Sequence, residues 1–318
     1  MKKIKSIFLP AIVAGVATLL VSSLASADNV FISNNGGDSI SEITGSNMPT
    51  TIIDTGLDSP TGVAIYGNDL YVANNGTSMD AGYIQEYSLA TDLPVGSPIV
   101  SNLVGPRGIT FDSAGNLYVA DQGNGTVIEI PTGTTNEEIL ATGLNAPNGV
   151  VDYNGVLYAT LGGSSQIVTI ADGSANPLVT SGLNSPNGIA IDGGNLFVVS
   201  HLSNQVLAFT TSGGALGSAV AAPYQSSLSG PKTIAVDSMG DFYVEDNGDE
   251  TVTEYSSTGV LLQVYSTNSD GNPAFNGSGF IVTQAVVPEP TTYVLMLTGL
   301  ALLYFRNRRK LATLPLNS

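Results

Sequence analysis

Short runs in which hydrophobic and polar residues alternate cover most of the chain. A representative unit begins with the alternating run Gly108–Phe111, which ends in the turn-like segment Asp112–Gly115. Three further β-rich runs follow at Asn116–Ala120, Thr126–Ile130 and Glu138–Ala141. Alternation with a period of two, bounded by Gly, Asp, Asn and Ser, is typical of half-buried β-strands. The pattern therefore predicts a small antiparallel sheet of four strands for this unit.

The unit recurs along the chain behind a short phrase, Leu-x-x-Pro-x-Gly. Its prolines stand at 60, 106, 147, 186 and 231, so successive copies lie between 39 and 46 residues apart. In the last copy Thr233 replaces the glycine. A period near forty with four strands per unit is the mark of a β-propeller, in which each repeat forms one blade.

The two ends of the chain supply the pieces of one more blade. Asn29–Asn34 matches a second strand and Ser39–Thr44 a third, while Ser278–Val282 matches a first strand with nothing after it. Pairing the two ends would remove the exposed sheet edges. We therefore expect an all-β, six-bladed propeller over residues 28–285, closed by its N- and C-terminal strands.

A large ring recurs at one position of the second strand in each repeat. These residues are Tyr71, Tyr118, Tyr158, Phe197 and Tyr243. A bulky side chain at a fixed repeat position is usually a core filler. We expect these rings to pack between blades and not to form a binding stripe.

Charge is distributed very unevenly. Between Asp28 and Val287 the only basic residues are Arg107 and Lys232, against 25 acidic ones, which gives this span a formal charge of −23. Such a domain repels nucleic acids and anionic surfaces. The chain has no cysteine, so disulfides contribute nothing to its stability.

Both ends of the chain resemble sorting signals. Residues 1–27 combine a basic start, an apolar run and the small residues Ala25-Ser26-Ala27, as secretory signal peptides do. Residues 286–318 hold Pro288-Glu289-Pro290, an apolar stretch that we expect to be a membrane helix, and a basic cluster that includes Arg308, Arg309 and Lys310. This order resembles the PEP-CTERM sorting signal. The resemblance implies exosortase as a partner, export across the inner membrane of a Gram-negative bacterium, transient membrane anchoring, and a final place at the cell surface or outside the cell.

The repeats resemble NHL repeats, whose blades read Pro-x-Gly-Ile-Ala-Val-Asp and then Gly-x-Leu-Tyr-Val-Ala-Asp. Gly108–Ile130 fits this pattern best. NHL blades often carry a basic residue before the isoleucine of the third strand. Here that place holds Thr126, Gln166, Gln205 and Thr251. Contacts to phosphate or nucleic acid are therefore not expected.

The residue before each repeat glycine should lie beside the central channel, so these residues form a ring that we call the axial ring. Its members are Thr61, Arg107, Asn148, Asn187, Lys232 and Ser278. Both cations of the domain fall in it, three blades apart, so they should face each other across the axis. The ring either holds a small anionic ligand between the two cations, or each cation pairs locally with a carboxylate such as Asp121 or Asp246.

Regucalcin and gluconolactonase propellers, which the repeats also resemble, hold a divalent metal with ring residues that include Glu and Asp. Asn148 and Asn187 look like the amide ligands of that set, but the ring carries no carboxylate. A hard cation prefers anionic oxygen. We therefore predict no metal site and no cofactor; Ca²⁺ on the acidic loops has no supporting motif.

The loop after the second strand opens on the same face. It offers Asn34, Asn74, Asp121, Ser200 and Asp246, which serve either turns or sugar hydroxyls. The lone histidine, His201, lies in this loop and is the weak catalytic candidate, with Asp246 as its partner.

These features favour a non-enzymatic surface or extracellular binding module, associated with exopolysaccharide through the sorting signal. Two alternatives remain open: a channel-face enzyme of the lyase or lactonase type, and a structural matrix protein with no saturable ligand.

Overall fold

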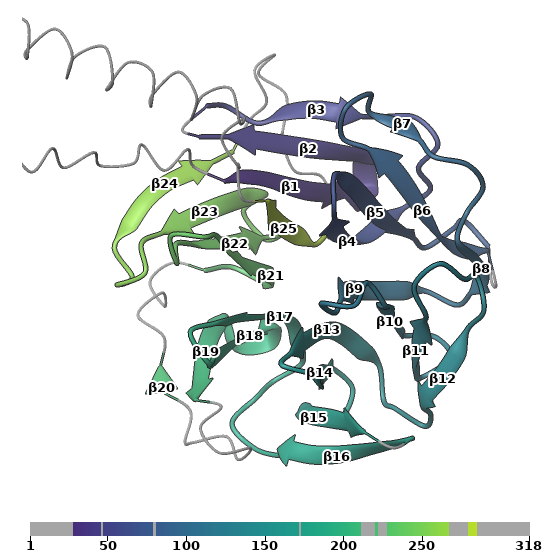
Figure 1. Cartoon of the computed structure of the whole chain (residues 1–318). Coiled ribbons are helices and arrows are strands. Elements are labelled where there is room, and N and C mark those ends of the chain that lie inside the picture. Colours follow the sequence, from purple (N-terminus) through teal and green to yellow (C-terminus); the bar gives the residue numbers. More distant parts are fainter. Residues whose placement is uncertain are drawn as a thin grey trace, which may run out of the picture.

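The protein folds into six small antiparallel sheets arranged as blades around a common axis (Figure 1). This computed structural model describes residues 28–45, 47–78, 81–171, 173–210, 220–221, 228–266 and 279–284. Both terminal signals, Ser278 and the predicted membrane helix lie outside these residues. The six-bladed, all-β prediction is confirmed.

Each blade runs from an innermost strand at the axis to an outer strand at the rim. The innermost strands are β4 (Pro60–Tyr66), β9 (Pro106–Phe111), β13 (Pro147–Tyr153), β17 (Pro186–Asp192), β21 (Pro231–Val236) and β25 (Ile281–Gln284). The second strands are β1 (Asn29–Asn34), β5 (Asp69–Asn74), β10 (Leu117–Asp121), β14 (Val156–Leu161), β18 (Asn195–Ser200) and β22 (Phe242–Asp246). Innermost strands of successive blades contact one another all the way round the ring.

The outer half of each blade completes the sheet. The third strands are β2 (Ser39–Thr44), β6 (Gly82–Ser88), β11 (Thr126–Ile130), β15 (Gln166–Ala171), β19 (Gln205–Thr210) and β23 (Thr251–Tyr255). The outer strands are β3 (Thr50–Ile53), β7 (Leu93–Pro94), β8 (Val100–Leu103), β12 (Glu138–Ala141), β16 (Ser174–Val179), β20 (Val220–Ala221) and β24 (Leu261–Tyr265). Strands β7 and β8 both pair with β6. Two short 3-10 helices follow second strands, η1 (Asn35–Gly37) and η2 (His201–Ser203).

The ring closes through the two ends of the described chain. Strand β25 pairs with β1 in antiparallel register, with Ile281 opposite Ile32 and Gln284 opposite Asn29. This confirms the predicted closure, although the closing strand begins at Ile281 and not at residue 278.

The repeat glycines are required because adjacent blades approach one another closely at the axis. A Cβ added to Gly108 would lie 2.7 Å from the carbonyl oxygen of Asn148, and one on Gly149 would lie 2.6 Å from that of Asn187. Gly62 faces the carbonyl of Arg107 in the same way. The glycine of each complete Pro-x-Gly phrase therefore lies against the axial-ring residue of the next blade. This contact explains why the phrase Pro-x-Gly recurs.

The residue before each repeat proline adopts a left-handed backbone. Glycine fills this place in two copies, at Gly105 and Gly230, where φ is 68° and 77°. Ser59, Ala146 and Ser185 fill it elsewhere, with φ between 52° and 53°. A side chain in this conformation costs about 1–2 kcal/mol, so three of the five turns store strain.

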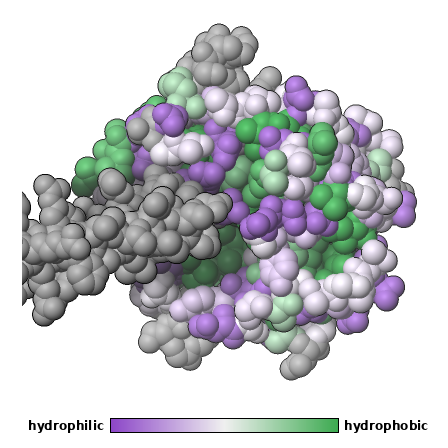
Figure 2. Space-filling model, turned by 45° about the horizontal axis from the view of Figure 1, so that its top comes forward, coloured by the Kyte–Doolittle hydropathy of each residue, from purple (hydrophilic) through white to green (hydrophobic). Residues whose placement is uncertain are grey.

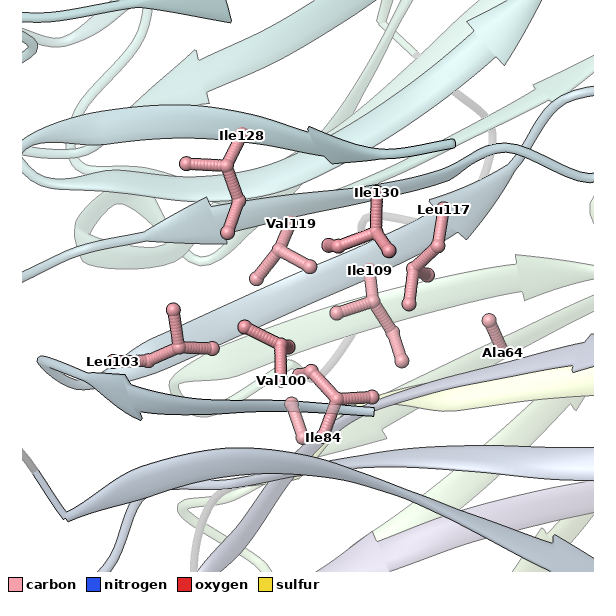
Figure 3. Close-up of a cluster of buried hydrophobic side chains, with 10 residues drawn as sticks. Ala64, Ile84, Val100, Leu103, Ile109, Leu117, Val119, Ile128 and Ile130 are labelled. Atoms are coloured by element: carbon pink, nitrogen blue, oxygen red, sulfur yellow. The ribbon is translucent and has the colours of Figure 1, made fainter. Parts of the chain in front are cut away.

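The hydrophobic core lies between blades. Figure 3 shows the cluster between the sheets of β4–β8 and β9–β12, where Ile84, Val100 and Leu103 meet Ile109 and Val119. Of the recurring rings, Tyr158, Phe197 and Tyr243 are buried between blades as predicted. Tyr71 and Tyr118 are only partly buried.

Candidate functional site

The axial ring lies at one end of a central channel. A cavity of about 250 Å³ on the axis is lined by all six innermost strands, with side chains such as Ile65, Ile109, Ile189 and Ile234. Its lining begins after the axial-ring position in each strand, so the ring residues stand at the mouth. In Figure 2 hydrophobic residues, in green, occupy a hollow near the centre of the molecule between hydrophilic ones.

Arg107 and Lys232 lie on opposite sides of this mouth. They are the second residues of β9 and β21, which lie three places apart in the ring of six innermost strands. Burial lowers the pKa of Arg107. Burial also lowers the pKa of Lys232; the carboxylate of Glu245 opposes that shift, and the positive charge of Arg107 adds to it. The two cations therefore interact electrostatically in a partly desolvated site.

Two other axial-ring residues are engaged with neighbouring blades. Thr61 is 1% exposed, and its hydroxyl donates to the carbonyl oxygen of Pro106 at 2.7 Å. Asn148 donates from Nδ2 to the carbonyl of Pro186, at 3.0 Å. Asn187 Oδ1 is buried and has no hydrogen-bond partner among the described residues. Among the described axial-ring residues, Arg107 and Lys232 are the charged ones, and they are therefore the strongest candidates to contact an anionic ligand.

Two mouth residues were missed by sequence reasoning. Gln122 accepts a hydrogen bond from Arg107 Nε at 3.3 Å and donates to Asn148 Oδ1 at 2.5 Å. Glu245 is fully buried beside Lys232, and its Oε2 has no hydrogen-bond partner among the described residues. The carboxylate that acts on Lys232 is Glu245. It is neither Asp121 nor Asp246, the two partners that the sequence suggested.

A signal for Glu245 does exist in the repeats. It occupies the next-to-last place of the second strand, where other blades carry Ala73, Ala120 and Val199. The polar residues at this place reach the next blade, as when Thr160 Oγ1 donates to the carbonyl of Asn187 at 2.6 Å. A carboxylic acid at a repeat position where three other blades carry a small or apolar residue is therefore a sequence signal for a further polar residue beside the axial ring.

Burial raises the pKa of Glu245 to about 8. Lys232 and the N–H of Gly279 oppose this shift, and Asp246 adds to it. Burial of this carboxyl therefore favours its neutral form over the ionised one.

His201 lies at a repeat position that joins adjacent blades. Its Nδ1 is 3.0 Å from the carbonyl oxygen of Pro231, so this nitrogen carries the proton. Asn35 and Gln122, at the same place after their second strands, reach Pro60 and Asn148 in their own neighbouring blades. His201 also acts electrostatically on Asp246, so the proposed pair does share one neighbourhood.

The polar residue that ends the second strand serves a turn in four blades. In each, the side chain accepts a hydrogen bond from the backbone N–H two residues before the repeat proline. The pairs are Asn74 with Asp58 (3.0 Å), Asp121 with Val104 (2.9 Å), Ser200 with Asn184 (2.8 Å) and Asp246 with Ser229 (2.6 Å). This geometry is the turn-forming use of these residues that we predicted as one of two alternatives.

Among the described residues no three His, Cys, Asp or Glu side chains gather as a metal site would require. No helix in this part of the chain is long and apolar enough to cross a membrane.

Comparisons with known proteins support the fold and the sorting signal. A chain in the crystal structure of a nidogen/laminin complex aligns with a TM-score of 0.68 and 17% identity, over 81% of this chain and 98% of that one. At this identity the likeness shows the fold alone. No curated protein sequence matches. Residues 286–310 match the family model for the PEP-CTERM protein-sorting motif. The chain is therefore a six-bladed β-propeller with a PEP-CTERM signal, exported through exosortase to the cell surface of a Gram-negative bacterium.

Proposed function

We propose that the exported propeller is a non-enzymatic binding module whose axial mouth holds a carboxylate of an acidic exopolysaccharide. The observation that carries this proposal is the placement of Arg107 and Lys232. They are the only basic residues between Asp28 and Val287, and both stand at the mouth of the channel.

Holding two cations together in a partly desolvated site is unfavourable unless an anion joins them. Burial lowers the pKa of both Arg107 and Lys232, which is the expected sign of this cost. Arg107 donates a hydrogen bond from Nε to Gln122, and a guanidinium has further N–H donors at its other two nitrogens. An Arg and a Lys on opposite sides can therefore grip a carboxylate by charge-assisted hydrogen bonds.

Glu245 lies beside the same site. Burial raises the pKa of its carboxyl and Lys232 opposes this rise, so the group takes up a proton more readily than an exposed glutamate does. In its protonated form the carboxyl is a hydrogen-bond donor, and an incoming carboxylate supplies the acceptor that Glu245 Oε2 does not find among the described residues.

The ligand class follows from the sorting signal together with the charge of the mouth. The PEP-CTERM system tends to accompany exopolysaccharide production, and the mouth selects the acidic members of that class. The channel below the mouth has a volume of only about 250 Å³, so a polysaccharide chain would cross the mouth and not enter the axis.

Calorimetric titration of the exported protein with uronic-acid oligosaccharides tests this function. We expect saturable binding that weakens with salt, and no binding of neutral glucan oligosaccharides of equal length. Arg107→Ala and Lys232→Ala should each weaken binding by about tenfold or more, because each removes a charge-assisted hydrogen bond. Lys232→Arg, which keeps the charge, is the matched control.

The alternatives predict different outcomes. A channel-face enzyme predicts turnover that His201→Ala abolishes while Arg107→Ala and Lys232→Ala leave ligand binding intact. The contact between His201 and Pro231 assigns this histidine a structural task instead. A purely structural matrix protein predicts no saturable ligand at all, and that result would overturn the binding proposal.

A further inference from the structure

A groove of about 730 Å³ lies between the sheets of β4–β8 and β9–β12, on the side of the disc opposite the axial mouth. It lies where the innermost strands β4 and β9 end, at Tyr66 and Phe111, whereas the axial-ring residues stand where these strands begin. The segment Pro131–Asn136 forms its outer wall. Its volume is that of a small-molecule site.

Three aromatic rings line this groove. Tyr66 stacks on Phe111 with ring centroids 4.9 Å apart, and Tyr71 meets Phe111 edge-on at 4.7 Å. Tyr66 is 41% exposed. Tyr71 is only partly buried, whereas the rings at its repeat position in two other blades, Tyr158 and Tyr243, are buried. The face of an aromatic ring carries partial negative charge and attracts cations, alkylated ammonium ions above all.

Two carboxylates lie beside the rings. Glu86 lines the groove and stands directly opposite Tyr71 in the pairing of β5 with β6. Asp69 is two residues before Tyr71 on the same strand, so it projects from the same face of the sheet. Burial and the charge of Asp69 both raise the pKa of Glu86, and a hydrogen bond with Tyr71 lowers it.

No basic side chain lines the groove, and the two basic residues of the described chain belong to the axial mouth. In a span of charge −23 the field at this groove is therefore strongly negative and favours a cationic ligand. A bare divalent ion would need six to eight oxygen ligands, which a wall of aromatic rings does not supply.

From the aromatic wall, the paired carboxylates and the size of the groove, we infer that it binds an alkylated ammonium ion of the choline type. The alkyl groups lie against Tyr66 and Phe111, and the positive charge faces Glu86 and Asp69. Thr132, Thr134 and Asn136 belong to the outer wall of the groove. The hydroxyls of Thr132 and Thr134 donate to the carbonyls of Gly115 and Pro131 and so keep only acceptor capacity for a polar substituent. This site is independent of the function proposed for the axial mouth.

Titration of the exported protein with choline, and separately with its uncharged isostere 3,3-dimethyl-1-butanol, tests the inference. We expect saturable choline binding at least about tenfold tighter than binding of the isostere, because only choline carries the charge. Equal affinity for the two compounds would overturn the inference, and so would the absence of choline binding, with or without binding of neutral oligosaccharides in the groove.

Variants locate the ligand. Tyr66→Leu and Glu86→Gln should each weaken choline binding by about threefold to tenfold. Tyr153 ends β13 six residues after its repeat proline, as Tyr66 does in β4, so Tyr153→Leu is the matched control and should bind choline normally. Equal weakening in the control would exclude the groove. Arg107→Ala should leave choline binding unchanged, which separates this test from that of the axial mouth.

The ammonium group could belong to a free solute or to a lipid head group, and a vesicle assay separates these sources. Sedimentation with phosphatidylcholine vesicles, but not with phosphatidylglycerol vesicles, would assign the head group as the natural ligand. Choline binding without vesicle binding would assign a free solute. Both results uphold the site.

Discussion

The axial mouth and the aromatic groove are both polar sites in one acidic disc, but they are built in different ways. The mouth uses positions that recur from blade to blade: the residue after the repeat proline and the residues near the end of the second strands. The groove uses side chains that only two neighbouring blades combine, such as Tyr66, Phe111 and Glu86. The recurring positions hold adjacent blades together and also contact any ligand, so substitutions there should lower the stability of the fold. Substitutions in the groove should cost binding alone.

The largest effect should come from a repeat glycine. Gly108→Ala places a Cβ about 2.7 Å from the carbonyl oxygen of Asn148, a backbone atom that cannot move without shifting the next blade. We expect a loss of about 3 kcal/mol of unfolding free energy, measured by denaturant titration. Thr233→Ala, at the same position of the fifth repeat, keeps a Cβ that is already accommodated and should cost only about 1 kcal/mol. Equal losses would contradict this account of the glycine.

Glu245 should make stability depend on pH. Its folded pKa, raised by burial to about 8, exceeds its usual value of 4.5, so the native state binds this proton more tightly than the unfolded state does. Stability from this group is complete below pH 4.5 and is lost as pH rises toward 8. Lys232, Asp246 and the Gly279 N–H face the same carboxyl and set the size of the effect. Glu245→Gln should flatten the profile and stabilise the protein by about 2 kcal/mol at pH 8, read from melting curves across this range.

His201 should behave as a joint between blades. His201→Ala removes the hydrogen bond to Pro231 and should cost about 1 kcal/mol. His201→Gln should restore most of that loss, because Gln122 fills the same repeat position with an amide. If His201 were catalytic, glutamine at this position would not restore activity, so the two variants separate the structural role from the catalytic one.

The strained turns offer a stabilising change. Ala146 has φ of 53° before its repeat proline, and glycine adopts this conformation freely. Ala146→Gly should raise the unfolding free energy by about 1 kcal/mol, while Gly105→Ala at the same position should lower it by a similar amount. Thermal melts of the two variants should therefore move in opposite directions.

The smallest effect on stability should be in the groove. Tyr66 is largely solvent-accessible and contributes its stacking on Phe111, so Tyr66→Leu should cost no more than about 1 kcal/mol. A large loss of stability in this variant would remove the contrast between the groove and the recurring positions.

The sequence was sufficient to predict the features that recur from repeat to repeat. The spacing of five prolines predicted five blades, and the matching of both termini to strand patterns predicted a sixth that closes through the pairing of β25 with β1. The repeat register placed Arg107 and Lys232 on strands three places apart in the ring. It was not sufficient for contacts between unlike positions. Glu245 reaches the mouth from a second strand, and Tyr66 meets Phe111 across two blades. Such contacts depend on the direction of individual side chains and on the gap between sheets. The spacing of the sequence repeats contains no information about either.

The closing strand also decides how the disc is attached. Strand β25 ends at Gln284, and the sorting motif begins at residue 286, so a single residue separates the last strand from the tail. Mechanical load on an anchored tail would therefore act first on the four residue pairs that join β25 to β1. While the tail remains attached, the seam that completes the circle is also its first point of tension.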